Sequence, residues 1–299
     1  MQQFHKNQSP VFKFSTQKIT LANQQKPIYQ TGFITHGETR YVHAATLVMM
    51  PNHMLRAAWY GGNRERGRNV KIYSSVSSPY AEHIQWSKPV AIMSAPRTER
   101  SELRYIKSLG NPILVRVKDK LWLFYVSIFG GWSTSSLNLS ISNDNGHTWS
   151  APHQLWTSAF FNLSTLLKGT PIHYTNGYIG LPAYHELFDK ASLLIRFKDD
   201  AAMYDISRVA WGGHVLQPLI FVINSREAIA LNRHYGKEHR QIIESQTYDA
   251  GKSWVNPHPI SLPNPDAALS GVVTYRHHFL LVFNNDKYGR HNLSMALSN

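Results

Sequence analysis

The chain has 299 residues and no cysteine, and its 31 Lys and Arg exceed its 18 Asp and Glu, giving a formal net charge of +13. Without cysteine there is neither a disulfide framework nor a cysteine-ligated metal site. No apolar run reaches the ~18 residues of a membrane-spanning helix. The charge favours anionic partners, although a generally basic solvated surface is the alternative. Nucleic acid is not expected, because no helix-based reader or aromatic-basic motif is visible.

The first residues, MQQFHKNQSPVFKFS, lack the charged-then-apolar pattern of a secretory leader. If this is the whole chain, we expect a cytoplasmic or membrane-peripheral protein in contact with an anionic membrane surface. If a leader has been removed, we expect a periplasmic protein.

Short runs rich in aromatic and branched residues follow one another along the chain, separated by Asn, Gly or Pro. They span residues 120–128, 137–142, 178–184, 219–224, 228–233, 277–285 and 292–298. No window keeps a helical period for more than a few turns. The sequence therefore predicts an all-β protein.

One turn between such runs occurs twice, as SISNDNGHTWSAP (140–152) and as TYDAGKSWVNP. We expect the aspartate to accept bonds from backbone N–H groups, the glycine to adopt a positive φ, and the tryptophan to pack between neighbouring sheets. The matching residues are Ser142, Asp144, Gly146, Thr148 and Trp149 in the first copy and Thr247, Asp249, Gly251, Ser253 and Trp254 in the second.

Two other segments resemble incomplete copies of this turn. One contains Trp86 followed by Ser87 and Pro89, and the other contains Trp211 preceded by Asp205. A repeat of roughly 40–60 residues is typical of propeller blades with four strands each. A two-sheet sandwich is the alternative, but it does not predict the same turn twice. The sequence therefore favours a β-propeller.

The Ser-x-Asp-x-Gly-x-Thr-Trp turn resembles the Asp-box of the sialidases. Segments 43–75, 111–126, 169–186, 216–222 and 262–271 are also similar to the bacterial sialidase-like proteins, or predicted neuraminidases, so that the resemblance covers roughly residues 40–299. It implies a single sialidase-like β-propeller domain over residues 1–299, of the six-bladed family and with an incomplete last blade. Residues 1–40 would form an N-terminal segment that closes or covers the ring.

The resemblance implies an exo-glycosidase that removes a terminal 2-keto sugar acid, either sialic acid or the Kdo of lipopolysaccharide, from an acidic glycan. Such enzymes use a tyrosine nucleophile paired with a glutamate, a separate carboxylic acid and a clamp of three arginines, and they are an exception to the two-carboxylate scheme. No cofactor is implied. The histidines show no HExxH or similar metal signature.

For the clamp, the resemblance places Arg233 and Arg290 at the second and third arginines. Arginine suits this role because a guanidinium can form two parallel hydrogen bonds with a carboxylate. His43 stands where the first arginine is expected, with Arg40 nearby and Arg64 one loop later. Each arginine could instead be an ordinary surface residue.

For the chemistry, Glu65 is the candidate general acid, although flanking arginines would lower its pKa. Tyr184 and Glu186 alternate to the same side of a strand, so they could present a phenol and a carboxylate together. Asn264 and Asp266 are expected to line the same axis. The alternatives are a salt-bridging role for Glu65 and packing between blades for Tyr184.

Two further expectations follow from the resemblance. The printed residues stop where another Asp-box would begin, which predicts that a second polypeptide or self-association completes the propeller. The competing function is a non-catalytic propeller that binds an acidic glycan or a protein partner.

Overall fold

The computed structural model describes residues 9–14, 31–78, 84–158, 162–187, 190–212, 214–236, 240–274 and 277–298. The chain forms two compact units. The N-terminal unit comprises Ile19–Thr170 and Ala183–Lys190, and the C-terminal unit comprises Met1–Lys18, Pro171–Pro182 and Ala191–Asn299. Within the described residues, no helix is long and apolar enough to cross a membrane.

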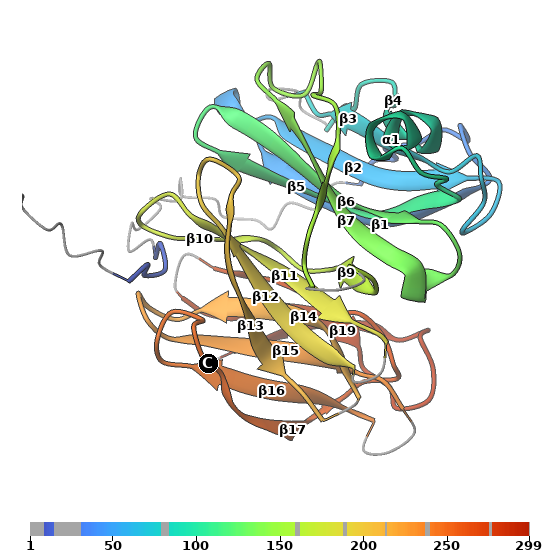
Figure 1. The fold of residues 1–299 in the computed structure, drawn as a ribbon. Helices are drawn as coiled ribbons and strands as arrows, with labels where there is room; N and C mark the ends of the chain where they lie inside the picture. The colour runs from blue at the N-terminus through green and yellow to red at the C-terminus, as the bar shows by residue number, and fades with distance from the viewer. Residues whose placement is uncertain are drawn as a thin grey trace, which may run out of the picture. The chain divides into compact units, whose positions relative to one another are not determined.

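The N-terminal unit contains two antiparallel sheets of consecutive strands (Figure 1). The first sheet consists of β1 (Tyr41–Met49), β2 (Leu55–Gly62), β3 (Lys71–Val76) and β4 (Val90–Ser94). The second consists of β5 (Ser108–Val117), β6 (Lys120–Ile128), β7 (Ser135–Ser142) and β8 (His153–Leu155). Helix α1 (Ala95–Glu102) joins the two sheets, and single turns η1 (Pro51–His53) and η2 (Trp132–Thr134) lie in loops.

A third sheet is formed by β9 (Thr165–Leu167), β10 (Ile172–His173), β11 (Ile179–His185), β12 (Ala191–Phe197) and β13 (Met203–Ala210). Strand β11 belongs to both units, because the division falls between Pro182 and Ala183. The C-terminal unit also contains the sheet of β14 (Val215–Val222), β15 (Ala228–His234), β16 (Gln241–Thr247) and β17 (Val255–Pro263). Its last sheet consists of β18 (Ser270–Val273), β19 (Phe279–Asn284) and β20 (Leu293–Leu297).

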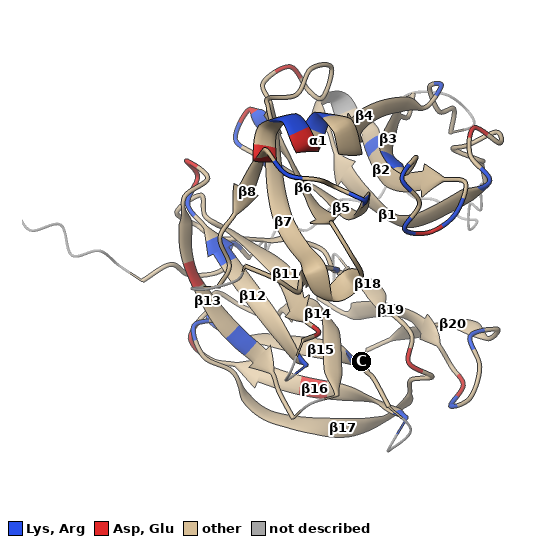
Figure 2. Ribbon diagram, turned by 45° about the vertical axis from the view of Figure 1, so that its right-hand side comes forward, with Lys and Arg blue, Asp and Glu red and all other residues tan. Residues whose placement is uncertain are grey.

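These sheets confirm the all-β class and the predicted repeat of antiparallel four-stranded units. The described residues contain five antiparallel sheets and not the six blades expected: three have four strands, one has five and one has three. The strands carry few charged residues, and most Lys, Arg, Asp and Glu lie on loops and on α1 (Figure 2).

The repeated turn has the predicted geometry in both copies. In the first, Asp144 accepts bonds from the backbone N–H of Thr148 at 2.8 Å and from its hydroxyl at 2.5 Å. The hydroxyl of Ser142 donates to Asp144 and accepts from the N–H of Gly146, each at 2.7 Å, and Gly146 has a φ of 90°. In the second copy, the hydroxyl of Thr247 donates to Asp249 at 2.9 Å and accepts from the N–H of Gly251 at 3.0 Å.

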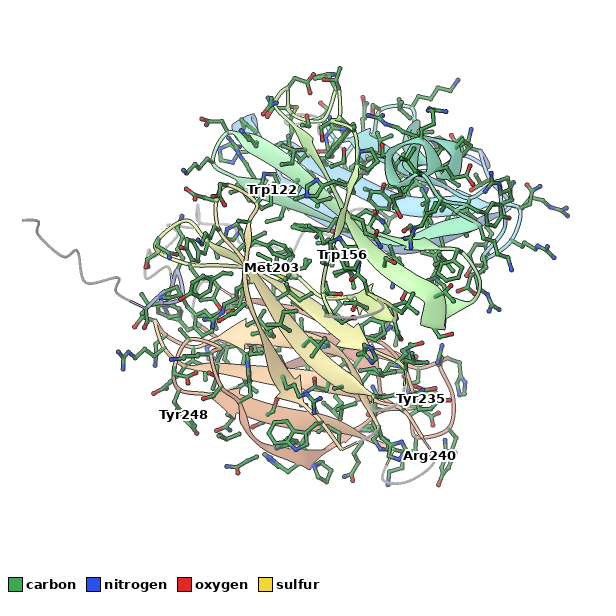
Figure 3. All side chains as sticks on the ribbon, viewed as in Figure 1. Trp122, Trp156, Met203, Tyr235, Arg240 and Tyr248 are labelled. Carbon is green, nitrogen blue, oxygen red and sulfur yellow. The ribbon has the colours of Figure 1, made fainter. Side chains whose placement is uncertain are left out.

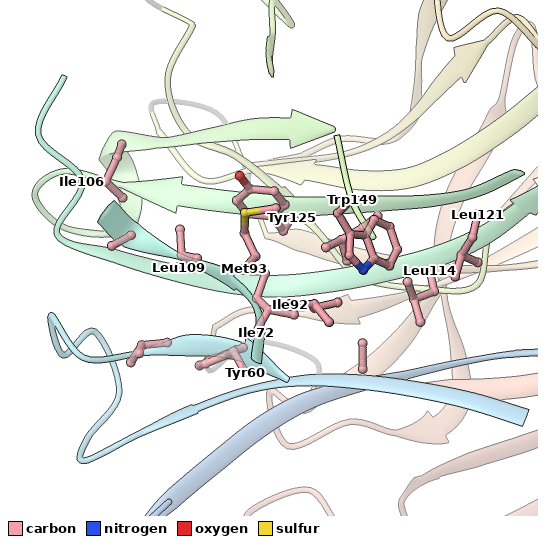
Figure 4. Close-up of a cluster of buried hydrophobic side chains, with 14 of the residues drawn as sticks. Tyr60, Ile72, Ile92, Met93, Ile106, Leu109, Leu114, Leu121, Tyr125 and Trp149 are labelled. Atoms are coloured by element: carbon pink, nitrogen blue, oxygen red, sulfur yellow. The ribbon is translucent and has the colours of Figure 1, made fainter. Parts of the chain in front are cut away.

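The tryptophan of each turn is buried between two sheets, as predicted. Trp149 packs with residues of the first and second sheets, among them Tyr60, Ile92, Leu114 and Leu121 (Figure 4). Trp254 belongs to a corresponding cluster that contains residues of the third and fourth sheets. The turns therefore attach neighbouring blades to each other through an apolar contact.

Trp86 is a true copy of the turn's exit. The N–H of Ser87 donates to the Val76 carbonyl at 2.9 Å, and the N–H of Val76 donates to the Ser87 hydroxyl at 3.1 Å. Ser150 makes the same two bonds with Ile141, at 2.8 and 3.0 Å.

Trp211 is not a copy of the turn, so this part of the repeat prediction is wrong. It follows β13 and is 44% exposed, whereas the corresponding connection of the third sheet is the short turn between β12 and β13. Asp205 lies within β13 and pairs with Arg196 instead of organising a turn. The spacing between Asp205 and Trp211 therefore reflects a strand followed by an exposed tryptophan, and not a turn.

Candidate active site

The first strand of several sheets contains a bulge at which one residue adopts a left-handed backbone conformation. The register shifts occur next to Ala44 in β1, Asn111 in β5 and Gln217 in β14, whose φ values are 50°, 45° and 52°. A bulge bends a strand and redirects a side chain, and non-glycine residues in this conformation cluster at functional sites. Two groups of candidate residues lie beside these bulges, one in each unit.

In the C-terminal unit, two arginines converge on one carboxylate. Arg233, on β15, donates through Nε to Asp266 at 2.7 Å and through Nη1 to Gln217 Oε1 at 3.0 Å. Arg290, in the loop between β19 and β20, donates to the Asp266 carbonyl and lies 3.8 Å from its carboxylate. The structure therefore brings together both arginines that the sequence assigned to a clamp.

The exposure of this arginine cluster allows a ligand to reach it. The side chain of Arg233 is 17% exposed, that of Asp266 33% and that of Arg290 58%. Nη2 of Arg233 has no partner in the described part of the chain. Asp266 has a φ of 59° in the loop before β18, so its backbone is held in an uncommon conformation while its side chain orients two cations.

Asn264 has a different role from the one predicted. It is 1% exposed, its Nδ2 donates to the Ala267 carbonyl at 2.9 Å, and its Oδ1 accepts from the Ala267 N–H at 3.1 Å. The amide is therefore fully engaged in shaping the loop that presents Asp266. It acts on the arginine cluster through that loop.

In the N-terminal unit, aromatic side chains surround the candidate residues His43 and Glu65. His43, exposed on β1, has its ring centroid 5.8 Å from that of Tyr41 and 5.6 Å from that of Tyr60. Burial raises the pKa of the Tyr41 phenol, and the neighbouring Glu65 carboxylate adds to this shift. Burial also raises the pKa of Tyr60, with further contributions from Glu65, Tyr41 and Tyr184. Phenols in this environment remain protonated and can donate a hydrogen bond.

Tyr184 lies on the part of β11 that belongs to this unit. It is 3% exposed, and its hydroxyl accepts from Asn111 Nδ2 at 3.4 Å, while the same amide donates to the Leu167 carbonyl at 3.0 Å. Glu186 follows the strand's last residue, and its N–H bonds to Ser164. The predicted alternation of Tyr184 and Glu186 along one strand is therefore interrupted, because β11 ends at His185.

The loop between β2 and β3 exposes the remaining candidates. Arg64 and Glu65 are both exposed there, and the Arg64 carbonyl accepts from Gly67 at 3.1 Å. Arg40, which precedes β1, is also exposed. The N-terminal unit thus gathers Glu65, His43 and Tyr184 around Tyr60.

Four residues beside these groups were not predicted from the sequence: Tyr41, Tyr60, Asn111 and Gln217. Asn111 and Gln217 each precede a proline at a bulge. That polar-proline dipeptide near the start of an apolar run is the sequence signal that could have identified them.

Comparison with known proteins places this arrangement in a family. The model of the BNR repeat-like domain matches residues 53–299. The chain belongs to this family, and it has the sialidase-like β-propeller fold. Among curated proteins, none matches the sequence.

Solved structures of sialidases resemble the BNR repeat-like chain throughout most of its length. A Hadza microbial sialidase superposes with a TM-score of 0.72 at 17% identity over 87% of this chain, which spans 56% of that protein. The intramolecular trans-sialidase of Ruminococcus gnavus gives 0.69 at 13% identity, covering 87% of this chain and 80% of that one. NanB sialidase of Streptococcus pneumoniae gives 0.69 at 12% identity, covering 93% and 61%. At these identities the likeness establishes the fold alone.

Proposed function

We propose that this BNR repeat-like protein is an exo-glycosidase that removes a terminal 2-keto sugar acid from an acidic glycan. The observation that carries the proposal is the convergence of Arg233 and Arg290 on Asp266. Two guanidinium groups held side by side provide the paired donors that a substrate carboxylate needs. Asp266 keeps them in place before substrate binds, which reduces the entropy lost on binding.

The N-terminal unit by itself holds candidate residues of the types that acid–base and nucleophilic chemistry requires. Tyr184 would be the nucleophile, Glu186 its base and Glu65 the acid that protonates the leaving oxygen. His43 and Arg64 would contribute hydrogen-bond donors for an anion in this unit. Asn111, bonded to the Tyr184 hydroxyl, would orient the phenol.

Sialic acid is the first candidate substrate, because the similar solved structures include sialidases. Kdo has the same 2-keto acid head group and is the second candidate. Completion by a second polypeptide or by another copy, contact with an anionic membrane surface and a single domain over residues 1–299 stay predictions. The segment proposed to cover the ring lies mostly outside the described residues.

Hydrolysis of fluorogenic α-glycosides of sialic acid and of Kdo tests the proposal. We expect turnover of one of them, and we expect Arg233→Lys to weaken it by about tenfold or more through loss of a bidentate contact. Arg226→Lys is the matched control, since Arg226 is exposed in the turn between β14 and β15. Equal loss in both variants, or no turnover of either glycoside, would refute the proposal.

A non-catalytic acidic-glycan or protein-binding propeller is the second candidate. The burial of Tyr184, at 3% exposure, favours it, because a packed phenol needs no catalytic role. Calorimetry with free sialic acid and free Kdo separates the two candidates. Binding that depends on Arg233, without turnover of either glycoside, would establish this alternative for a glycan ligand.

A further inference from the structure

A cavity of about 820 Å³ lies within the N-terminal unit beside the first repeated turn, and its described lining includes none of the residues proposed for glycosidic chemistry. Strands β2, β3 and β4 contribute to its wall, together with the turn residues from Asn145 to Trp149. We call it the turn cavity. Its volume falls within the ~300–1,000 Å³ typical of small-molecule sites.

The floor of the turn cavity contains a buried arginine with an unused donor. Arg56, on β2, is 7% exposed, and its Nη1 donates to the Ser74 hydroxyl at 3.0 Å. Its Nε is buried and has no partner among the described residues. A guanidinium in the lining of a cavity favours a ligand that carries a negative charge.

A second donor in the wall is also unused. Nε1 of Trp149, which is 8% exposed, is buried and without a partner over the ranges that the structure describes. The turn holds Arg56 closely: a Cβ on Gly146 would lie 2.8 Å from Cζ of the guanidinium. The turn therefore fixes the position of Arg56 in the lining of the cavity.

Three side chains of the wall carry a positive charge: Arg56, Lys88 and Arg97. Lys88, Arg97 and His147 line the cavity with Arg56, and no Asp or Glu belongs to its described lining. Arg97 is anchored by bonds to the carbonyls of Trp149 and Ser150. Burial lowers the pKa of Arg56, and the nearby Asp144 carboxylate opposes this shift. That carboxylate is already bonded to Ser142 and Thr148.

Apolar side chains form another part of the wall, with Met50, Met54, Val76, Val90, Ile92 and Trp149, and polar residues such as Ser74, Ser87 and Thr148 complete it. An inorganic anion would leave the apolar part exposed to water. We propose that the turn cavity binds a small amphipathic organic acid, whose carboxylate accepts from Arg56 and whose apolar part lies against Met54 and Trp149. This ligand class differs from the sugar acids, which are polar over their whole length.

Isothermal titration calorimetry with octanoate tests the assignment, with 1-octanol and inorganic phosphate as comparison ligands. We expect one octanoate per chain, with 1-octanol weaker by about tenfold because it lacks the charge that pairs with Arg56. Phosphate is expected to bind more weakly than octanoate, since it leaves the apolar wall uncovered. Octanoate binding no tighter than that of either comparison ligand would overturn the proposal.

Two variants and a control locate the binding. Arg56→Met, which keeps most of the side-chain volume, should weaken octanoate by about tenfold, whereas Arg100→Met, an exposed position on α1, should leave it unchanged. Ala91→Trp, at an exposed position of the wall, should block binding without entering the core. Ala91→Trp tests the location of the octanoate site even if Arg56→Met fails to fold. Octanoate affinity unchanged in folded Arg56→Met, or in Ala91→Trp, would place the ligand elsewhere and refute the site.

Discussion

Replacing Trp149 by alanine should destabilise the N-terminal unit by about 3 kcal/mol. Deletion of a large buried aromatic costs ~3–5 kcal/mol. Trp149 is 8% exposed within a cluster that includes Tyr60, Ile92 and Leu114. Its buried Nε1 has no partner among the described residues, and removing an unpaired N–H returns part of the loss, so we expect the low end of the range.

Trp156→Ala is the matched control for this experiment. Trp156 lies in the same unit, just after β8, but is 63% exposed (Figure 3). Surface substitutions usually change stability by less than ~0.5 kcal/mol. Urea denaturation followed by far-ultraviolet circular dichroism gives both values, provided that the denaturant slope is unchanged between variants. Equal midpoints for Trp149→Ala and Trp156→Ala would show that the turn does not attach one blade to the next.

The remaining predictions concern the turns and the arginine cluster. Gly251→Ala should lower the free energy of unfolding in urea by about 1–3 kcal/mol, because the added Cβ would lie 2.7 Å from Leu194 at a φ of 80°. Gly37 has open space around it, so Gly37→Ala should add only backbone strain and lower the same free energy by about 1 kcal/mol. Hydrogen bonds from Thr148 hold the pKa of Asp144 well below its usual range. The stability that this carboxylate contributes is therefore fully present above the unfolded pKa of about 4, and it is lost as the pH falls through the lower pKa of the folded state. Asp144→Asn should therefore flatten the acid limb of stability against pH, and an acid limb identical to wild type would contradict this. If the proposed function is correct, Gln217→Ala should raise KM for the sugar-acid glycoside about fivefold with little change in kcat, because Arg233 would lose its bond to Gln217. An unchanged KM would count against a positioning role for Gln217.

The parts of the fold that sequence predicts well are those in which several residues of one short segment must cooperate. The turn at Asp144 needs a hydroxyl, a carboxylate and a glycine at fixed spacing, so its pattern is specific. A lone tryptophan is less informative. Trp86 keeps the exit bonds of the turn through Ser87, whereas Trp211 has no such partner in sequence and is exposed.

The candidate site is harder to predict because its contacts join residues that are distant in the sequence. Arg233 and Arg290 were found through resemblance, but the contact of both with Asp266 depends on how a loop before β18 is folded. The same holds for Asn264, whose polar identity suggested a ligand contact and whose amide is instead bonded within its own loop. Residue type alone does not distinguish these two roles, whereas burial does.

The bulges give a physical reason why the same strand position recurs in both groups of candidate residues. Asn111 and Gln217 each sit at a left-handed residue just before a proline, a conformation that the residue before proline rarely adopts. Ala44 takes the corresponding place in β1, directly after His43. Strain of this kind persists only where the surrounding strands impose it, and its effect is to aim one polar side chain away from the ladder of hydrogen bonds. Asn111 uses this to reach Tyr184, and Gln217 uses it to hold Arg233. The repeat that builds the blades therefore also supplies, in the first strands β1, β5 and β14, a position from which a functional residue can be presented.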